Sequence, residues 1–286
     1  MTAIAYLNGT WQSPEDAKVS VLDRGFMFGD GIYEVIPVYS GRPFALARHL
    51  VRLNNSFNEI RLASPLSDAE WSSLMLEGVA RSGESTASIY VQITRGVAPK
   101  RDFKYPEVPV PTVLMIVAPS PLLERTRIDP LDVVTLEDFR WARGHIKTTS
   151  LIAAGMLRNE AIARGADDAI LIKNGKVTEA TASNVLIARN GVLATPPRSN
   201  HVLHGITRDV VVALAREHGL AIEEREIDVA ELETADEIMI TSSTHEVWPV
   251  GSLNGKPVGN GAAGVMWRQL DGLFQDFKRG DQAASA

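Results

Sequence analysis

The chain has 286 residues, of which 45% are hydrophobic and 22% charged, a composition typical of a soluble globular protein. Its formal net charge of −6 excludes an electrostatic affinity for nucleic acid or for anionic membranes. With no cysteine, the chain has no disulfide, no thiolate metal site and no cysteine nucleophile.

The length allows two medium-sized domains, each with its own core. In the first part of the chain, the turn Asn8-Gly9 predicts a hairpin over residues 3–11. Residues 24–31 predict a glycine-punctuated apolar loop before a strand over 32–39. Pro37 removes one backbone donor from that strand, so we expect it at a sheet edge or at a bulge. Helices are then expected at 47–60 and 67–81, and strands at 87–94 and 110–118.

Pro119-Ser120-Pro121 marks the expected boundary, which gives a domain over 1–118, a linker over 119–130 and a domain over 131–286. A helix is expected behind Thr148, Thr149 and Ser150, any of which could cap it. Its apolar face contains Leu151, Ala154, Leu157 and Ala161, widened by Met156 and Ile162. The other elements expected in this domain are a strand at 132–135, hairpins at 168–180 and 184–194, a helix from Thr207 to Gly219, strands at 221–227 and 237–241, a short helix capped by Asp228, and a helix at 261–277 followed by a frayed tail.

The predicted fold class is therefore α/β (α+β type), with two domains and mixed sheets. Lys147 precedes the first helix of the second domain, and Glu179 lies on the returning strand of the following hairpin. This arrangement can bring an amine close to a carboxylate, which is the pair that pyridoxal phosphate chemistry requires.

Three motifs carry a family resemblance: His145-Ile146-Lys147-Thr148-Thr149, Thr178-Glu179-Ala180-Thr181-Ala182-Ser183-Asn184-Val185 and Leu203-His204-Gly205-Ile206-Thr207-Arg208. In this order they resemble the class IV (fold type IV) pyridoxal phosphate aminotransferases, and most closely the D-amino acid transaminase branch. The resemblance runs from Tyr6 to about Trp267. It implies a transaminase that moves the amino group of a D-amino acid to a 2-oxo acid in two half-reactions, with pyridoxal 5'-phosphate as cofactor.

The resemblance also implies residue roles. Lys147 would hold the cofactor as a Schiff base and then move the substrate's α-proton, and burial would lower its pKa into a useful range. Glu179 would face the pyridine nitrogen and keep it protonated. Tyr33 would form a wall of the site. The residues that match the family's phosphate-binding positions are Arg52, Gly205, Ile206, Thr207, Ser242 and Ser243, with a hydroxyl cap and free N–H groups expected at the start of the helix.

Two residues could bind the substrate carboxylate. The D-amino acid branch uses an Arg-x-His pair, whereas this chain has Pro99-Lys100-Arg101-Asp102-Phe103. Arg101 supplies the guanidinium if the register slips by one, Lys100 binds the carboxylate if it does not, and neither register keeps the histidine. A guanidinium grips a carboxylate at two points, but an ammonium is a point charge. A weaker binding site for the carboxylate suits substrates that have no carboxylate, such as (R)-amines.

Alternatives therefore remain: an (R)-selective amine transaminase, a branched-chain L-amino acid transaminase, an aminodeoxychorismate lyase, or a non-catalytic phosphate-ligand binding protein. By resemblance we expect a homodimer in which the Phe103 loop reaches the partner's site. The six histidines show no metal-binding spacing, so no metal is expected. Without a signal peptide or membrane-length apolar run, a cytoplasmic location is expected.

Overall fold

The computed structural model describes residues 3–120 and 128–284, and the chain divides into two compact units. The first unit comprises Met1–Glu124, Ile146–Leu151 and Ala284–Ala286, and the second comprises Arg125–His145 and Ile152–Ala283. Of the linker expected over 119–130, residues 121–127 lie outside the described part of the chain.

The first unit contains a six-stranded sheet in the order β2-β1-β6-β5-β3-β4. Every neighbouring pair is antiparallel, whereas a mixed sheet was expected here. The Asn8-Gly9 hairpin and the two helices are confirmed. The elements of this unit are β1 (Ile4–Leu7), β2 (Thr10–Gln12), α1 (Arg24–Phe28), β3 (Gly31–Tyr39), β4 (Arg42–Pro43), α2 (Leu46–Glu59), α3 (Asp68–Ser82), β5 (Ala87–Thr94) and β6 (Thr112–Pro119).

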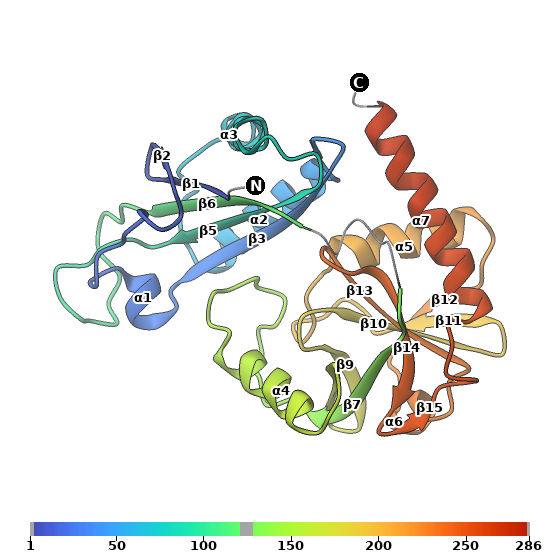
Figure 1. Cartoon of the computed structure of the whole chain (residues 1–286). Coiled ribbons are helices and arrows are strands. Elements are labelled where there is room, and N and C mark those ends of the chain that lie inside the picture. Colours follow the sequence, from blue (N-terminus) through green and yellow to red (C-terminus); the bar gives the residue numbers. More distant parts are fainter. Residues whose placement is uncertain (1–2, 121–127, 285–286) are drawn as a thin grey trace. The chain divides into compact units, whose positions relative to one another are not determined.

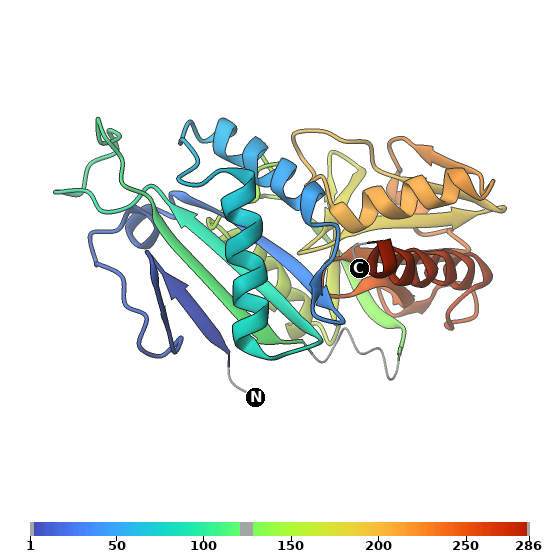
Figure 2. The same ribbon diagram turned by 90° about the horizontal axis from the view of Figure 1, so that it is seen from above.

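Helices α2 and α3 lie across one face of this sheet (Figures 1 and 2). A capping box between Ser67 and Glu70 begins α3, and Gly83 ends it in the left-handed conformation, as the sequence predicts. Alternate residues of β3 and β5 face the helices and form the core with them, because successive strand side chains point to opposite faces.

Pro37 lies where the missing donor has no cost. The Pro37 carbonyl accepts from Phe44 N, so this residue's backbone points away from β5. On the same outer side of β3, Tyr33 N donates to Lys147 O and Thr149 N donates to Gly31 O. The strand is therefore an edge over most of its length, as predicted, and the 147–149 segment covers part of that edge.

The second unit contains a nine-stranded mixed sheet in the order β12-β11-β10-β13-β14-β7-β8-β9, with β15 on β14. The pairs β7–β8, β7–β14 and β11–β12 are parallel. The two Asn-Gly turns expected here have positive φ at both residues, which is the predicted type I′ geometry. The elements are β7 (Leu131–Glu137), α4 (Ile152–Ala163), β8 (Asp168–Lys173), β9 (Lys176–Ala180), β10 (Asn184–Arg189), β11 (Val192–Thr195), α5 (Ile206–Glu217), β12 (Ile222–Glu224), α6 (Val229–Leu232), β13 (Glu237–Ser242), β14 (Glu246–Leu253), β15 (Lys256–Pro257) and α7 (Val265–Ala284).

Residues of β8 alternate between two apolar clusters. Ala169 and Leu171 pack on α4, while Ile170 and Ile172 join the larger cluster on the opposite face. In Figure 2, α5 and α7 both lie over the strands of this unit. None of the described helices is both long and apolar enough to cross a membrane.

Several sequence expectations are wrong in this structure. Residues 24–28 form the helix α1, capped by Asp23, instead of a loop. On α4, Met156 and Ile162 are exposed and do not widen the buried face. The strand expected at 221–227 spans only 222–224, and α7 begins at Val265 and continues past Lys278 instead of fraying there. Strands β14 and β15 were missed, because the polar start of β14 and Pro249 obscure its apolar run.

Candidate active site

Lys147 is held at the outer edge of β3 by its own backbone. Ile146, the preceding residue, is buried in the core of the first unit. The bond from Tyr33 N to Lys147 O measures 2.9 Å. The backbone of Lys147 is therefore fixed by the buried Ile146 before it and by the hydrogen bond from Tyr33 N.

The hydroxyls after Lys147 do not cap α4, contrary to expectation. Thr148 Oγ1 donates to Gly31 O at 3.0 Å, and Thr149 and Ser150 donate to Gly29 O, each at 3.0 Å. They therefore bind the Lys147 segment to the turn that begins β3. The two glycines permit this close approach, because a Cβ on Gly29 would lie 2.5 Å from Ser150 Oγ and one on Gly31 would lie 3.1 Å from Thr149 Oγ1.

The amine of Lys147 lies over an aromatic ring. Its Nζ is 4.3 Å from the centroid of Tyr33, which in turn is 5.7 Å from the ring of Tyr90. A cation over a tyrosine face is stabilised electrostatically. Burial, and then the charge of Tyr33, raise the pKa of Tyr90 to about 12, so its phenol stays protonated and donates to Gln92. Two sequence-predicted residues, Lys147 and Tyr33, are thus in direct contact.

Arg52 forms a buried ion pair with Glu34, the residue after Tyr33. Arg52 Nε and Nη2 donate to the two oxygens of Glu34 at 2.8 and 2.7 Å, and His49 Nδ1 lies 2.8 Å from Glu34 Oε2. Burial raises the pKa of Glu34, but Arg52 and His49 outweigh it and hold the pKa well below its usual range. Burial lowers the pKa of His49. Sequence reasoning singled out Arg52 and missed both of these partners.

We expect Glu34→Gln to destabilise the fold by about 3 kcal/mol at pH 7, since it leaves the buried Arg52 without its counter-charge. The pKa of Glu34 is lowered by folding, so its contribution is present above the ordinary carboxyl pKa of about 4.3 and is lost as the pH falls. Urea unfolding midpoints of both proteins should therefore converge in acid. The exposed pair Glu77–Arg81 supplies the control: Glu77→Gln should change the midpoint little. Equal midpoints for Glu34→Gln and the parent protein at pH 7 would contradict the prediction.

Glu179 is a buried carboxylate at the end of β9 in the second unit. Its Oε1 accepts from Arg140 Nη1 at 2.7 Å, and its Oε2 accepts from Leu203 N at 2.8 Å and Asn184 Nδ2 at 3.2 Å. Burial raises the pKa of Glu179, and Arg140 and Leu203 only partly oppose this. Arg140, Asn184 and Leu203 were not predicted as site residues, although Asn184 and Leu203 lie within the quoted motifs.

The start of α5 is joined to Glu179 through Asn184. Asn184 Nδ2 also donates to Leu203 O at 2.8 Å, and a Cβ on Gly205 would lie only 1.9 Å from Asn184 Oδ1. A side chain at position 205 would therefore displace the amide that contacts Glu179. The helix begins at Ile206 with Gly205 as a cap that has no side-chain bond, so the expected Thr207 hydroxyl cap is wrong. Thr207 is instead a buried residue of the first turn.

Ser242 ends β13, the strand on which α5 packs. Its Oγ accepts from His245 N at 3.0 Å and lies 3.3 Å from the Thr244 hydroxyl. Ser243 follows in the turn and is half-buried. The preceding residue, Thr241, pairs with Asn184 in the sheet, and its buried Oγ1 has no hydrogen-bond partner among the described residues. Hydroxyl groups thus gather beside the strand that supports the start of α5.

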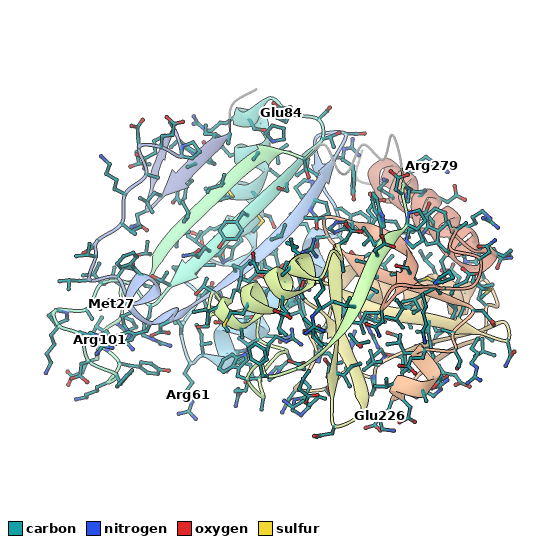
Figure 3. The ribbon with its side chains drawn as sticks, turned by 60° about the horizontal axis from the view of Figure 1, so that its bottom comes forward. Met27, Arg61, Glu84, Arg101, Glu226 and Arg279 are labelled. Atoms are coloured by element: carbon teal, nitrogen blue, oxygen red, sulfur yellow. The ribbon has the colours of Figure 1, made fainter. Side chains whose placement is uncertain are left out.

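The loop between β5 and β6 is tied to α1 by buried arginines. Arg24 Nη1 donates to Asp102 O at 2.6 Å, while Arg24 Nε and Arg95 Nε both donate to Asp30 Oδ2. Figure 3 shows Arg101 of this loop and Met27 of α1 at the same end of the first unit.

The two candidate carboxylate ligands differ in their surroundings. The Arg101 guanidinium lies 5.2 Å from the ring centroid of Phe28 and 5.9 Å from that of Phe103. Lys100 extends into solvent with a 77% exposed side chain and pairs with Asp102 at 3.3 Å. Both residues are exposed, but Arg101 lies near two aromatic rings whereas Lys100 pairs with Asp102.

The donor set fits pyridoxal phosphate. In the first unit, a half-buried amine over a tyrosine is a partner for an aldehyde. In the second unit, a buried carboxylate and a glycine-capped helix start beside hydroxyls are partners for a ring nitrogen and a phosphate. The orphaned Thr241 hydroxyl lies on the same strand as Ser242 and leaves a polar group able to bind a ligand. In the described part of the chain, no group of three or more His, Asp or Glu side chains could hold a metal ion.

Comparison with known proteins agrees with this chemistry. The family model described as Amino-transferase class IV matches residues 31–253. The chain is 38% identical to a D-alanine aminotransferase from Bacillus licheniformis over 94% of this chain and 95% of that protein. It is 37% identical to one from Staphylococcus aureus (strain COL), with 95% and 96% covered.

Among solved structures, the branched-chain aminotransferase from the thermophilic archaeon Thermoproteus uzoniensis, with norvaline, has a TM-score of 0.86 and 26% identity. The match covers 97% of this chain and 95% of that structure. The predicted fold class, with its two sheets and covering helices, is thereby confirmed. The chain belongs to the class IV aminotransferases, the fold type IV enzymes whose cofactor is pyridoxal 5'-phosphate.

Proposed function

We propose that this enzyme transfers the amino group of a D-amino acid, with D-alanine as the reference donor, to a 2-oxo acid. The observation that carries the substrate class is the 38% identity to a D-alanine aminotransferase over nearly the whole chain. When bound, pyridoxal phosphate supplies an electron sink for the negative charge that forms on the donor's α-carbon.

Lys147 is the proposed catalytic residue. Its Nζ would hold the cofactor covalently and, once the donor has displaced it, would carry the α-proton. The Tyr33 ring, whose centroid is 4.3 Å from Nζ, would form a wall beside the amine and limit where it can move. A phosphate-ligand binding protein needs neither Lys147 nor Glu179, so the presence of both argues against a non-catalytic role.

The proposed cofactor contacts follow from the chemistry of each group. Glu179 would accept a hydrogen bond from the protonated ring nitrogen, and the backbone N–H groups of Gly205, Ile206 and Thr207 would bind the phosphate. Ser242, Ser243 and Arg52 are the other proposed phosphate ligands. Arg52 also pairs with Glu34, so it would bind Glu34 and the phosphate through different edges of its planar guanidinium.

We assign the donor carboxylate to Arg101. Its guanidinium can grip a carboxylate at two points and lies near the Phe28 and Phe103 rings, whereas Lys100 is a point charge already paired with Asp102. Arg101→Ala should raise the KM for D-alanine about 10- to 100-fold, corresponding to about 1.4–2.8 kcal/mol. Lys100→Ala is the matched control and should change KM less than about threefold. Steady-state kinetics of both variants decide the assignment, and the reverse ranking would transfer the role to Lys100.

A homodimer and a cytoplasmic location stay predictions. In support of the homodimer, Leu22, Val97 and Val110 are exposed and lie close together, since Ala98 N donates to Leu22 O and Gly96 pairs with Val110. An apolar patch of this kind is typical of a surface that a second copy covers. The Phe103 loop, 76% exposed at that residue, would then reach the partner's site. Analytical ultracentrifugation tests the assembly.

The test of the function is a visible absorption titration of the purified enzyme with D-alanine, L-leucine and (R)-1-phenylethylamine in separate experiments. Conversion of the pyridoxal to the pyridoxamine form by D-alanine supports the proposal. Conversion by L-leucine alone would favour a branched-chain donor, and conversion by the amine alone would favour an amine transaminase, which the missing histidine near Phe103 makes the second candidate. Failure to bind added cofactor would reject all three.

A further inference from the structure

Arg140 connects two buried carboxylates of the second unit. Its Nε and Nη2 donate to Oδ1 and Oδ2 of Asp138 at 2.9 and 2.8 Å, and its Nη1 donates to Glu179 Oε1 at 2.7 Å. The side chains of Asp138, Arg140 and Glu179 are 3%, 14% and 6% exposed. Three ionisable groups at this depth form one electrostatic unit, because solvent screens them weakly.

Asp138 is fixed independently of Glu179. Its backbone N donates to Ile172 O at 2.7 Å, and its Oδ2 accepts from the Thr178 hydroxyl at 2.8 Å. Asp138 accepts two parallel hydrogen bonds from Arg140, and these set the plane of the guanidinium. The remaining nitrogen, Nη1, is thereby aimed at a single oxygen of Glu179.

The charges of the three groups do not cancel. With both acids ionised, Arg140 neutralises one of them and a net charge of −1 is left in a buried place. Charged groups of the described residues that face Glu179 are Arg140 and Asp138, whereas Leu203 and Asn184 offer uncharged donors. A buried unpaired charge is costly, so the cluster becomes neutral only when it takes up one further positive charge, either a proton on Glu179 or a cationic partner.

We propose that Asp138 and Arg140 are positioning residues that orient Glu179 and leave the cluster one positive charge short, so that it selects the protonated form of the cofactor's ring nitrogen. This inference rests on the proposed contact between Glu179 and that nitrogen. Burial favours protonated acids, but Arg140 offsets it enough at Asp138 to lower that pKa, while the pKa of Glu179 remains raised. The uncompensated negative charge of the cluster therefore lies on Glu179.

The two residues should act on Glu179 in opposite directions. Arg140→Met removes the positive neighbour and should raise the pKa of Glu179, and Asp138→Asn removes the negative neighbour and should lower it. If Arg140 and Asp138 only supported the fold, the two variants would be impaired in the same way, and the pKa of Glu179 would not move in opposite directions. Arg164→Met, which breaks an exposed ion pair with Glu160, is the matched control and should change nothing.

The measurement is the carboxyl titration of Glu179 in full-length, cofactor-free protein labelled with ¹³C at glutamate carboxyls. The Glu179 resonance is the one missing from the Glu179→Gln spectrum. We expect the midpoint to rise by about one pH unit or more in Arg140→Met and to fall by about one in Asp138→Asn. Circular dichroism and melting curves of each variant confirm that it is folded. An unchanged midpoint in folded Arg140→Met, or shifts of the same sign in both variants, would overturn the inference.

A second readout uses the cofactor. With ¹⁵N-labelled pyridoxal phosphate bound, the ring-nitrogen shift should indicate a less protonated nitrogen in Asp138→Asn than in the parent enzyme at the same pH. Equal protonation would contradict the selection of the protonated form even if the carboxyl titration moves as expected. If the parent chain binds no cofactor, the proposed function fails, and the ¹³C titration still decides whether Arg140 and Asp138 control Glu179.

Discussion

A Lys147→Ala enzyme is expected to lose at least about 10⁴-fold in kcat, corresponding to about 5.5 kcal/mol of transition-state stabilisation. The lysine side chain supplies both the covalent anchor and the group that moves the α-proton, and the nearby Tyr33 ring has no basic nitrogen to replace it. The visible band of the covalently held cofactor should disappear with the activity. Rapid-mixing kinetics with D-alanine and an absorption spectrum measure the two losses.

Lys173→Ala is the matched control, because Lys173 ends β8 beside the Asn174-Gly175 turn and has no proposed role. It should keep the band and the rate within about twofold. Borohydride reduction of the parent enzyme, followed by peptide mass spectrometry, should locate the cofactor on Lys147. An active Lys147→Ala enzyme, or a labelled peptide that contains Lys173 instead, would reject the assignment.

Local sequence signals predicted the elements well wherever the residue type itself favours the backbone conformation that the element needs. The three predicted Asn-Gly hairpins have turns that need positive φ at both residues, and few residue types adopt this conformation. The capping box of α3 and its closing glycine fix that helix by interactions within a few residues. These elements could be read from the sequence because their stabilising contacts are local.

The errors arise where a distant partner changes the local preference. Thr148, Thr149 and Ser150 are good helix caps by residue type, but the carbonyls of Gly29 and Gly31, far away in the sequence, accept their hydroxyls. The segment 24–28 reads as a loop, yet Asp23 caps it by accepting from Gly25 N. The sequence contains these residues but does not indicate which competing partner they bind.

The candidate site shows the same limit. Motifs point to Lys147 and Glu179, because their residue types carry the chemistry. The side chains that set their orientation and charge, such as Arg140, His49 and Glu34, have no motif that separates them from ordinary surface residues. Only pairing and burial identify them, and both depend on the tertiary fold.

Glu179→Gln should lower kcat by about 10²–10³-fold while the dissociation constant of the cofactor rises less than about tenfold. The amide of a glutamine still offers an oxygen to Leu203 N, so the local backbone keeps its partner. The negative charge is lost, however, and Asp138 and Arg140 alone sum to zero. Nothing then favours the proton on the ring nitrogen, and the electron sink weakens.

Spectral titration with pyridoxal phosphate gives the dissociation constant, and single-turnover kinetics with D-alanine give the rate. Glu160→Gln on the exposed face of α4 is the control, since Glu160 only pairs with a solvated Arg164. Tight binding with slow turnover in Glu179→Gln would mean that the carboxylate's charge, and not merely its shape, drives the reaction. If binding and rate were both unchanged, another group would have to bind the ring nitrogen. The missing positive charge of the Asp138–Arg140–Glu179 cluster would then have no effect on catalysis.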